Sequence, residues 1–131
     1  MPHRTVLEAK RLGIFSCHID APLEEVARRI AEEDISGMVV VDQEGFLAGV
    51  ITRIDLLRAY ISVPNWRKEQ VKTFMSSRVI TVGSDATLLE VAKILLEHHV
   101  HRVVVVREED GHQRPIAVIG DTDLVYNMMH S

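Results

Sequence analysis

The sequence has 131 residues, which is enough for one compact domain or for two small halves that share a core. Hydrophobic residues make up 47% of the chain and charged residues 26%, a composition typical of a globular protein and unlike that of a disordered one. The formal net charge of -4 argues against a nucleic-acid-binding protein, because phosphate backbones require a concentrated basic face.

The single cysteine, Cys17, excludes an internal disulfide and a cysteine-rich zinc site, which suits a reducing compartment. The N-terminal residues lack the apolar core of a signal peptide. No apolar run approaches the length needed to span a membrane. We therefore expect a cytoplasmic protein that binds neither nucleic acid nor membrane.

The first half of the chain predicts a strand, a helix, two strands and a second helix. Residues 6–12 are expected to form a short helical lead-in, and residues 14–17 a strand. Asp20 is suited to cap the next helix, with Pro22 in its first turn. The apolar residues of that helix recur at the spacing of one helical face: Leu23, Val26, Ala27, Ile30 and Ala31.

The apolar run at residues 38–41 predicts a strand that is buried on both faces. Residues 42–45 form the following turn, in which Gly45 is available for a positive φ angle. Residues 46–51 are the return strand, and the helix that follows begins with Thr52 and runs over residues 52–60.

The same order of elements occurs again in the second half, so the chain is a duplication. Subtracting Asp20 from Asp85 gives 65, whereas subtracting Asp55 from Asp123 gives 68. The second copy therefore contains three additional residues, which fit the polar turn predicted at residues 107–114. A period this long, present twice, indicates two packed supersecondary units rather than a solenoid.

The duplication divides the chain into a first repeat at residues 1–61, a linker at residues 62–70 and a second repeat at residues 71–131. In the second repeat a strand at residues 79–82 precedes a helix that Ser84–Asp85 is expected to open. We expect an α/β fold in which two βαββα-type repeats pack with pseudo-twofold symmetry.

The start of the helix after each return strand carries the most informative motif. Thr52 ends an apolar run, and Asp55 follows three residues later; the second copy has Asp123 at the same place but Gly120 instead of the threonine. One interpretation is a capping box, worth about 1 kcal/mol. The other is ligand binding, because a carboxylate at a helix start that faces a cleft can accept two hydrogen bonds from a cis-diol.

Three pieces of sequence, each weak alone, carry a family resemblance. They are residues 20–27 with their copy at 85–92, residues 49–55, and residues 100–105. On these pieces nearly the whole chain resembles a pair of cystathionine β-synthase (CBS) domains, the arrangement called a Bateman module. The resemblance implies a regulatory, non-catalytic module with two clefts between the repeats. In the family these clefts commonly hold AMP, ADP, ATP, NAD or S-adenosylmethionine.

The resemblance also assigns roles to residues. The aspartate that binds ribose hydroxyls in the family corresponds to Asp55 and Asp123, and the hydroxyl residue that precedes it corresponds to Thr52. Gly120 stands at the position of that hydroxyl in the second copy, so the two clefts are not expected to be equivalent.

His101 and Arg102 resemble the His-Arg pair that approaches phosphates in the nucleotide-sensing subunit of AMP-activated kinase. A solvated entrance to a strand is the alternative interpretation of this pair, and Arg53 is a further candidate for phosphate binding. By the same resemblance, the adenine pocket would be lined by Ser16, Ser36, Gly37, Met38, Ile80 and Thr81.

The histidines around His101 do not predict a metal site, because only the spacing of His98 and His101 could place two of them on one helical face. CBS modules commonly form homodimers, and the apolar helix faces at residues 56–60 and 124–129 are candidate contact surfaces. An unidentified regulated protein would be the further partner. The alternative function is a structural or dimerisation module that acts through protein contacts without a nucleotide.

Overall fold

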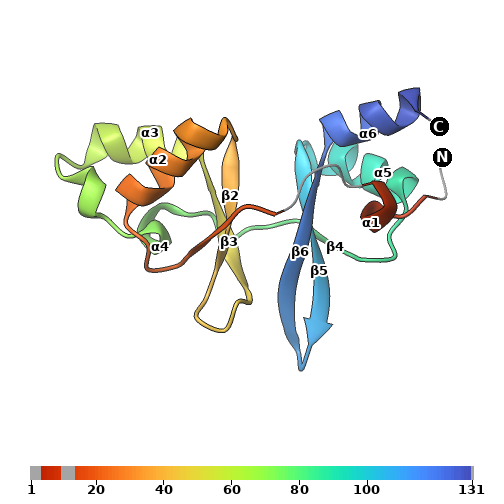
Figure 1. Cartoon of the computed structure of the whole chain (residues 1–131), viewed down its shortest axis with the longest axis horizontal. Helices are drawn as coiled ribbons and strands as arrows, with labels where there is room; N and C mark the ends of the chain where they lie inside the picture. Colours follow the sequence, from red (N-terminus) through yellow and green to blue (C-terminus); the bar gives the residue numbers. More distant parts are fainter. Residues whose placement is uncertain (1–3, 10–13, 131) are drawn as a thin grey trace. The chain divides into compact units, whose positions relative to one another are not determined.

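The computed structural model describes residues 4–9 and 14–130, so part of the predicted lead-in, residues 10–12, lies outside the described residues. The chain divides into two compact units, one formed by Phe15–Val79 and the other by Met1–Ile14 with Ile80–Ser131 (Figure 1). We call them the first-repeat unit and the second-repeat unit. Each contains a three-stranded sheet and packing helices, which confirms the predicted α/β class and the βαββα order.

In the first-repeat unit the sheet order is β1-β2-β3, with β1 parallel to β2 and β2 antiparallel to β3. Helices α2 and α3 pack against each other beside this sheet (Figure 1). The elements of the unit are β1 (Ser16–His18), α2 (Leu23–Glu33), β2 (Gly37–Val41), β3 (Leu47–Thr52), α3 (Arg53–Ser62), the 3-10 helix η1 (Trp66–Lys68) and α4 (Val71–Phe74).

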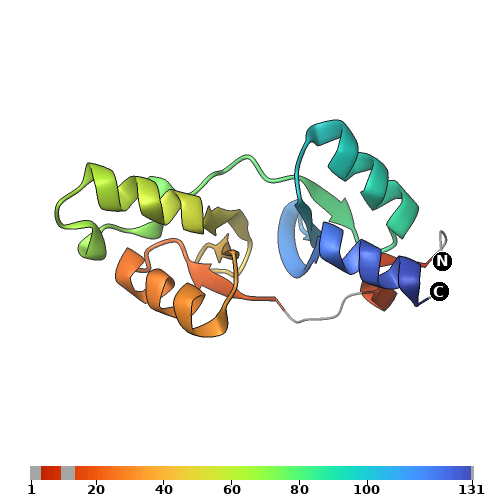
Figure 2. The same cartoon turned by 90° about the horizontal axis from the view of Figure 1, so that it is seen from above.

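The second-repeat unit has the same topology, with β4 parallel to β5 and β5 antiparallel to β6. Helices α5 and α6 lie side by side, as both views show (Figures 1 and 2). The elements of the unit are α1 (Val6–Ala9), β4 (Thr81–Gly83), α5 (Leu88–His98), β5 (Arg102–Glu109), β6 (His112–Gly120) and α6 (Asp121–Met129).

Corresponding residues build the two apolar cores, because the helices and strands of both repeats turn the same positions inward. The side chains of these two cores come from one face of the long helix, as its periodicity predicts, and from alternate strand positions. They include Leu23, Val26, Ile30, Val40 and Ile51 in the first-repeat unit, and Leu88, Val91, Leu95, Val105 and Ile119 in the second. The other face of the central strand is buried too, as the continuous apolar run at residues 38–41 predicts.

The three additional residues of the second repeat lengthen its hairpin. Residues 107–114 were expected to be a turn, but β5 continues to Glu109 and β6 begins at His112, so only Asp110 and Gly111 turn the chain. Both have positive φ angles (53° and 81°), as two-residue hairpin turns require. In the shorter hairpin of the first repeat, Gly45 has the predicted positive φ, at 86°.

Both long helices begin later than the sequence suggests. Helix α2 starts at Leu23 with Pro22 as its N-cap, and Asp20 instead forms an ion pair with Lys72 at 3.1 Å. Helix α5 is capped by Thr87, whose hydroxyl accepts the Glu90 amide at 3.2 Å, and not by Ser84–Asp85. The residues expected to cap these helices lie instead in tight turns that precede them. In the second repeat, the backbone hydrogen bond from Ala86 N to Gly83 O, at 3.2 Å, closes a turn that contains Ser84 and Asp85.

Each unit takes its lead-in segment from the other repeat. In the first-repeat unit the Leu23 amide donates to Glu69 O at 2.8 Å, and the Val71 amide donates to Ala21 O at 2.9 Å. In the second-repeat unit the same bonds recur 65 residues away: Leu88 N to Arg4 O at 2.9 Å and Val6 N to Ala86 O at 3.0 Å. The lead-in thus satisfies backbone groups at the start of α2 and of α5.

The predicted linker, residues 62–70, folds onto the first-repeat unit. Its 3-10 helix contacts α2 and α3. Trp66 packs at the edge of that core, with its ring 6.3 Å from the Tyr60 ring and the Arg67 guanidinium 5.1 Å from its centroid. The repeat boundaries predicted on either side of this segment describe the duplication of the sequence and stay a prediction.

Gly49 is the position where a side chain would interfere most directly with backbone packing. Val50 and Ser76 exchange two backbone hydrogen bonds of 2.9 Å, and a Cβ atom on Gly49 would overlap the Ser76 carbonyl oxygen. We expect Gly49→Ala to lower the free energy of unfolding of the first-repeat unit by about 1–3 kcal/mol. Urea titration, with hydrogen exchange at the Val50 amide, measures this effect.

The matched control is Gly83→Ala, because the only contact of its added Cβ would be the movable Asp85 Oδ1 at 3.3 Å. This control should change stability by less than about 0.5 kcal/mol. Equal stability of the Gly49→Ala variant and the unmodified chain would contradict the packing argument.

Candidate ligand-binding site

The first strand–helix junction is closed by a reciprocal capping box between Thr52 and Asp55. The Asp55 amide donates to the Thr52 hydroxyl at 3.4 Å. Oδ2 of Asp55 accepts the Thr52 amide at 2.8 Å and the Thr52 hydroxyl at 3.1 Å. The capping interpretation of this motif is therefore confirmed, and it fixes the orientation of the carboxylate.

The second oxygen of Asp55 is less constrained. Arg58 Nη1 lies 3.7 Å from Oδ1, and the Asp55 side chain keeps 11% of its exposure. One carboxylate oxygen is thus held by the helix start, while the other retains lone pairs for a further donor. A hydroxyl group that approached this junction would meet an oriented acceptor.

The second junction has only half of this arrangement. Oδ2 of Asp123 accepts the Gly120 amide at 2.8 Å, but Gly120 has no hydroxyl to return the bond. Behind it, the buried Asn127 donates to Asp123 O at 2.8 Å and accepts from Arg4 Nη1 at 2.6 Å. Asn127 was not identified from the sequence. A comparison of the two repeats could have identified it, because its counterpart in the first repeat is the apolar Ala59.

The residue before β2 and the residue before β5 reach the helix starts through the backbone. The Arg53 amide donates to Ser36 O at 3.1 Å, and the Asp121 amide donates to His101 O at 2.9 Å. Only the second junction adds a side-chain contact, in which His101 Nδ1 lies 3.1 Å from Asp121 Oδ2. This hydrogen bond holds the pKa of Asp121 below its usual value.

Beside each junction lies a cross-strand pair that contains one glycine, but the glycine is on the first strand of the pair in one repeat and on the second strand in the other. Gly37 lies opposite Thr52, whereas Arg102 lies opposite Gly120. Residues directly opposite in antiparallel strands point to the same face, so each pair presents one side chain. A Cβ on Gly37 would lie 2.8 Å from the Ile51 carbonyl oxygen, so the first-repeat unit has no room for a counterpart of Arg102.

The remaining predicted residues lie on or beside the strands. Ser16 in β1 pairs with Val39 in β2, and Met38 is buried in the apolar core. Ile80 accepts the Val104 amide at 3.0 Å, and the Thr81 hydroxyl accepts Gln113 Nε2 at 3.5 Å.

The structure therefore brings together two groups of predicted residues, one in each unit. They are Ser36, Gly37, Thr52, Arg53 and Asp55 in the first-repeat unit, and His101, Arg102 and Asp123 in the second.

Arg29 on α2 is a second residue that the sequence did not reveal. Its Nη1 donates to Ser16 O at 2.7 Å and so lies over the first strand of the sheet. The contact spans thirteen residues, and no local pattern predicts it.

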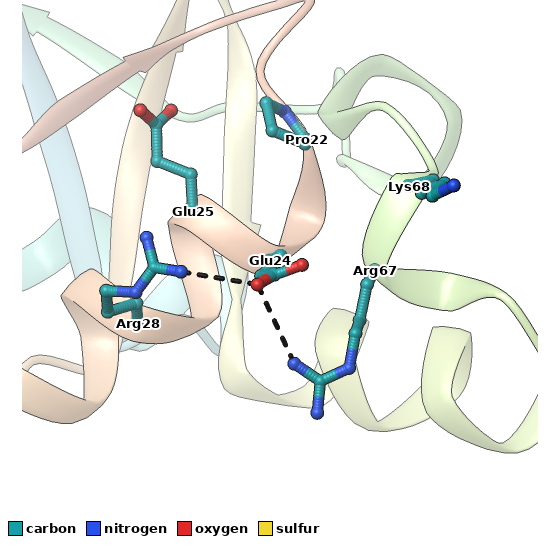
Figure 3. A pocket seen from close by; sticks show the side chains of 6 residues that line it. All are labelled: Pro22, Glu24, Glu25, Arg28, Arg67 and Lys68. Atoms are coloured by element: carbon teal, nitrogen blue, oxygen red, sulfur yellow. Dashed lines mark hydrogen bonds and ion pairs between the residues drawn. The ribbon is translucent and has the colours of Figure 1, made fainter.

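Two surface hollows accompany these units. One, of about 610 Å³, lies between α5 and α6 and is mainly apolar, with His101 and Asp121 among its lining residues. The other, of about 450 Å³, lies beside the first turn of α2 (Figure 3). There the Glu24 carboxylate contacts two guanidinium groups, that of Arg28 at 3.3 Å and that of Arg67 at 3.8 Å.

The hollow in Figure 3 is distinct from the first strand–helix junction. It adjoins the start of α2, whereas Ser36 follows the end of this helix. Eleven helical residues separate the two places by about 16 Å.

Within the described ranges, 4–9 and 14–130, no group of three or more histidine, cysteine, aspartate or glutamate side chains is arranged to hold a metal ion. Over the same residues, no helix has the length and hydrophobicity that a membrane span requires.

The fold agrees with a family comparison. The model of the CBS domain matches residues 7–62 and 71–130, so the chain belongs to the CBS domain family and contains two such domains in tandem. An inosine-5'-monophosphate dehydrogenase from Halobacterium salinarum is 31% identical over 99 residues, or 76% of this chain. The chain spans only 19% of that dehydrogenase, and 20% to 35% of two further curated relatives.

Solved structures share the fold at low sequence identity. The CBS domain pair of protein MJ0100, in complex with 5'-methylthioadenosine and S-adenosyl-L-methionine, is 22% identical, with a TM-score of 0.82 and coverage of 98% of both chains. Protein MJ1225 from Methanocaldococcus jannaschii, likened to γ-AMPK, is 20% identical, with a TM-score of 0.84. That match covers 97% of this chain and 48% of MJ1225.

The buried thiol beside Ser16 predicts a pH dependence of stability. Burial raises the pKa of Cys17 from 9.0 to about 11, although the charge of Arg29 partly opposes this shift. Because the pKa of the thiol is higher in the folded state than in the unfolded state, the contribution of the buried thiol to the free energy of unfolding is complete below pH 9. It is lost as the pH rises toward about 11. We expect a smaller loss of stability over this pH window in Cys17→Ala, measured by urea unfolding. Equal slopes in both proteins would contradict the assignment.

Proposed function

We propose that the chain is a regulatory, non-catalytic module that binds adenosine-containing ligands: AMP, ADP, ATP, NAD or S-adenosylmethionine. The observation that carries the proposal is the oriented carboxylate at the start of α3 and again of α6. Adenosine compounds bound to the similar CBS pair of MJ0100 support this choice of ligand class.

In this proposal the ribose hydroxyls bind Asp55 or Asp123, with Thr52 assisting in the first repeat. The free oxygen of the carboxylate accepts a hydroxyl proton, while its other oxygen remains in the helix cap. An adenine base bound to the first-repeat unit would lie against Ser16, Ser36, Gly37 and Met38, and one bound to the second-repeat unit would lie against Ile80 and Thr81.

The phosphates of a nucleotide would approach the cations near the junctions. Arg102 is exposed at the entrance to β5, with His101 before it, and Arg53 is exposed at the start of α3. Arg side chains suit this task because the guanidinium group can donate two parallel hydrogen bonds to a phosphate.

Ligand sensing follows if a ligand binds one conformation of the chain more tightly than another. Such a ligand shifts the populations of these conformations by its difference in affinity. A regulated protein, or the second chain of a homodimer, would respond to that shift.

Calorimetric titration of the unmodified chain and of Asp55→Asn/Asp123→Asn with AMP, ATP, NAD and S-adenosylmethionine tests the proposal. At least one ligand should bind the unmodified chain, and the double variant should bind it at least about tenfold more weakly, because a charged diol acceptor is lost. Thermal melting should show a rise in midpoint with ligand concentration for the unmodified chain.

The control is Glu90→Gln, which neutralises an acid in the Thr87 capping pair of α5, outside the proposed site. Its ligand affinity should be unchanged. Absence of heat for all four ligands with the unmodified chain, or equal binding by the double variant, would refute the proposal.

A second candidate function, a dimerisation module without nucleotide, is favoured by an exposed apolar surface on α5 and α6. Leu96 and Met129 are each 77% exposed, and Val125 and Met128 are exposed beside them. Apolar groups gathered in this way commonly mark contact surfaces. We propose that a second copy of the chain covers this surface, and this is compatible with ligand sensing.

Sedimentation of Leu96→Glu tests the dimer. The unmodified chain should sediment as a dimer, and the variant should dissociate at least about tenfold more readily, because it places a charge in an apolar contact. Gln43→Glu, in the exposed turn of the first hairpin, adds the same charge and should leave the dimer intact. A monomeric unmodified chain at about 100 µM would contradict the dimer.

A further inference from the structure

Two corresponding positions carry opposite charges in the two repeats. Arg53 begins α3 and donates its amide to Ser36 O, and Asp121 begins α6 and donates its amide to His101 O. The backbone hydrogen bonds are the same, at 3.1 Å and 2.9 Å. The first repeat thus combines a cation with a neutral hydroxyl residue, whereas the second combines an anion with a histidine.

The side chains of the second pair are engaged with each other at the surface. Oδ2 of Asp121 lies 3.1 Å from Nδ1 of His101, and the side chains are 58% and 83% exposed. A contact this exposed adds little to stability, so the fold does not require it. Its position matters more, because it occupies one of the two basic groups assigned to phosphate binding in the second repeat.

Arg102 differs from His101 in this respect. It lies opposite Gly120, where an added Cβ atom would contact the Arg102 Cβ at 3.8 Å, so the glycine leaves this neighbouring position empty. Within residues 4–9 and 14–130, no carboxylate lies at ion-pair distance from Arg102. The second junction therefore offers one accessible cation and one imidazole that a neighbouring carboxylate already holds.

We infer that Asp121 competes with the phosphate of a bound nucleotide for His101, and so sets the preference of the second-repeat site between charged and neutral adenosine ligands. This inference rests on the proposed function. A phosphate that reaches Nδ1 of His101 must displace the Asp121 carboxylate from this nitrogen, and the displaced carboxylate then repels the phosphate. A ligand without phosphate meets neither cost, so Asp121 is a determinant of specificity rather than of affinity in general.

A purely structural role for Asp121 predicts a different result. An acid in the first turn of a helix interacts favourably with the helix dipole. Its removal would destabilise α6 and lower the affinity for every ligand by the same factor. The two roles are therefore separated by comparing a charged ligand with a neutral one.

The test compares adenosine with AMP by calorimetry at low ionic strength, for the unmodified chain and Asp121→Ala. We expect the affinity for AMP to rise by about threefold to tenfold in the variant, while the affinity for adenosine changes by less than about twofold. Glu108→Ala is the control, because it removes one exposed acid about 20 Å along β5 from Arg102 and should leave both affinities unchanged.

A His101→Ala background tests whether the competition acts through the imidazole. In this background Asp121→Ala should raise the affinity for AMP by less than about twofold, because the group that both anions seek is gone. An undiminished effect there, or an unchanged ratio of AMP to adenosine affinity in the single variant, would overturn the inference while the proposed function stands. Absence of binding of both ligands to the unmodified chain would overturn this inference, whereas the proposed function is decided separately by the titration with all four ligands.

Discussion

The geometry of both junctions depends on a carboxylate that accepts the backbone amide at the start of its own helix. Asp55 and Asp123 each accept this bond at 2.8 Å, so the strand, the helix and the carboxylate are held as one rigid turn. Because the carboxylate is already oriented, the binding of a ligand to it costs less conformational entropy of the side chain. In the proposed function, folding and recognition would use the same side chain, and the two interpretations of the motif, capping and binding, are compatible.

Much of the fold follows from local patterns in the sequence. Apolar spacing located both cores, and the difference between the offsets of 65 and 68 located the additional residues in the second hairpin. Capping positions were less predictable. Asp20 and Ser84–Asp85 are residue types that commonly act as N-caps, but in this fold they lie in tight turns before the helices. The actual N-caps, Pro22 and Thr87, depend on backbone hydrogen bonds that composition does not encode.

The site was predictable where its residues are neighbours in the chain. Thr52 and Asp55 are three residues apart, so their contact follows from helix geometry alone. The contact between His101 and Asp121 spans 20 residues, and that between Arg4 and Asn127 spans 123. Such pairs form only after strands and lead-in have found their register, and a single sequence gives no local pattern for them.

The exchange of lead-in segments has a consequence for the assembly of the chain. A lone repeat would leave the amide equivalent to that of Leu23 without the carbonyl that Glu69 supplies. Two copies of such a repeat can each supply the missing segment to the other, so a pair of separate polypeptides satisfies the same backbone groups as the duplicated chain. The two halves, made as independent peptides, should therefore complement each other.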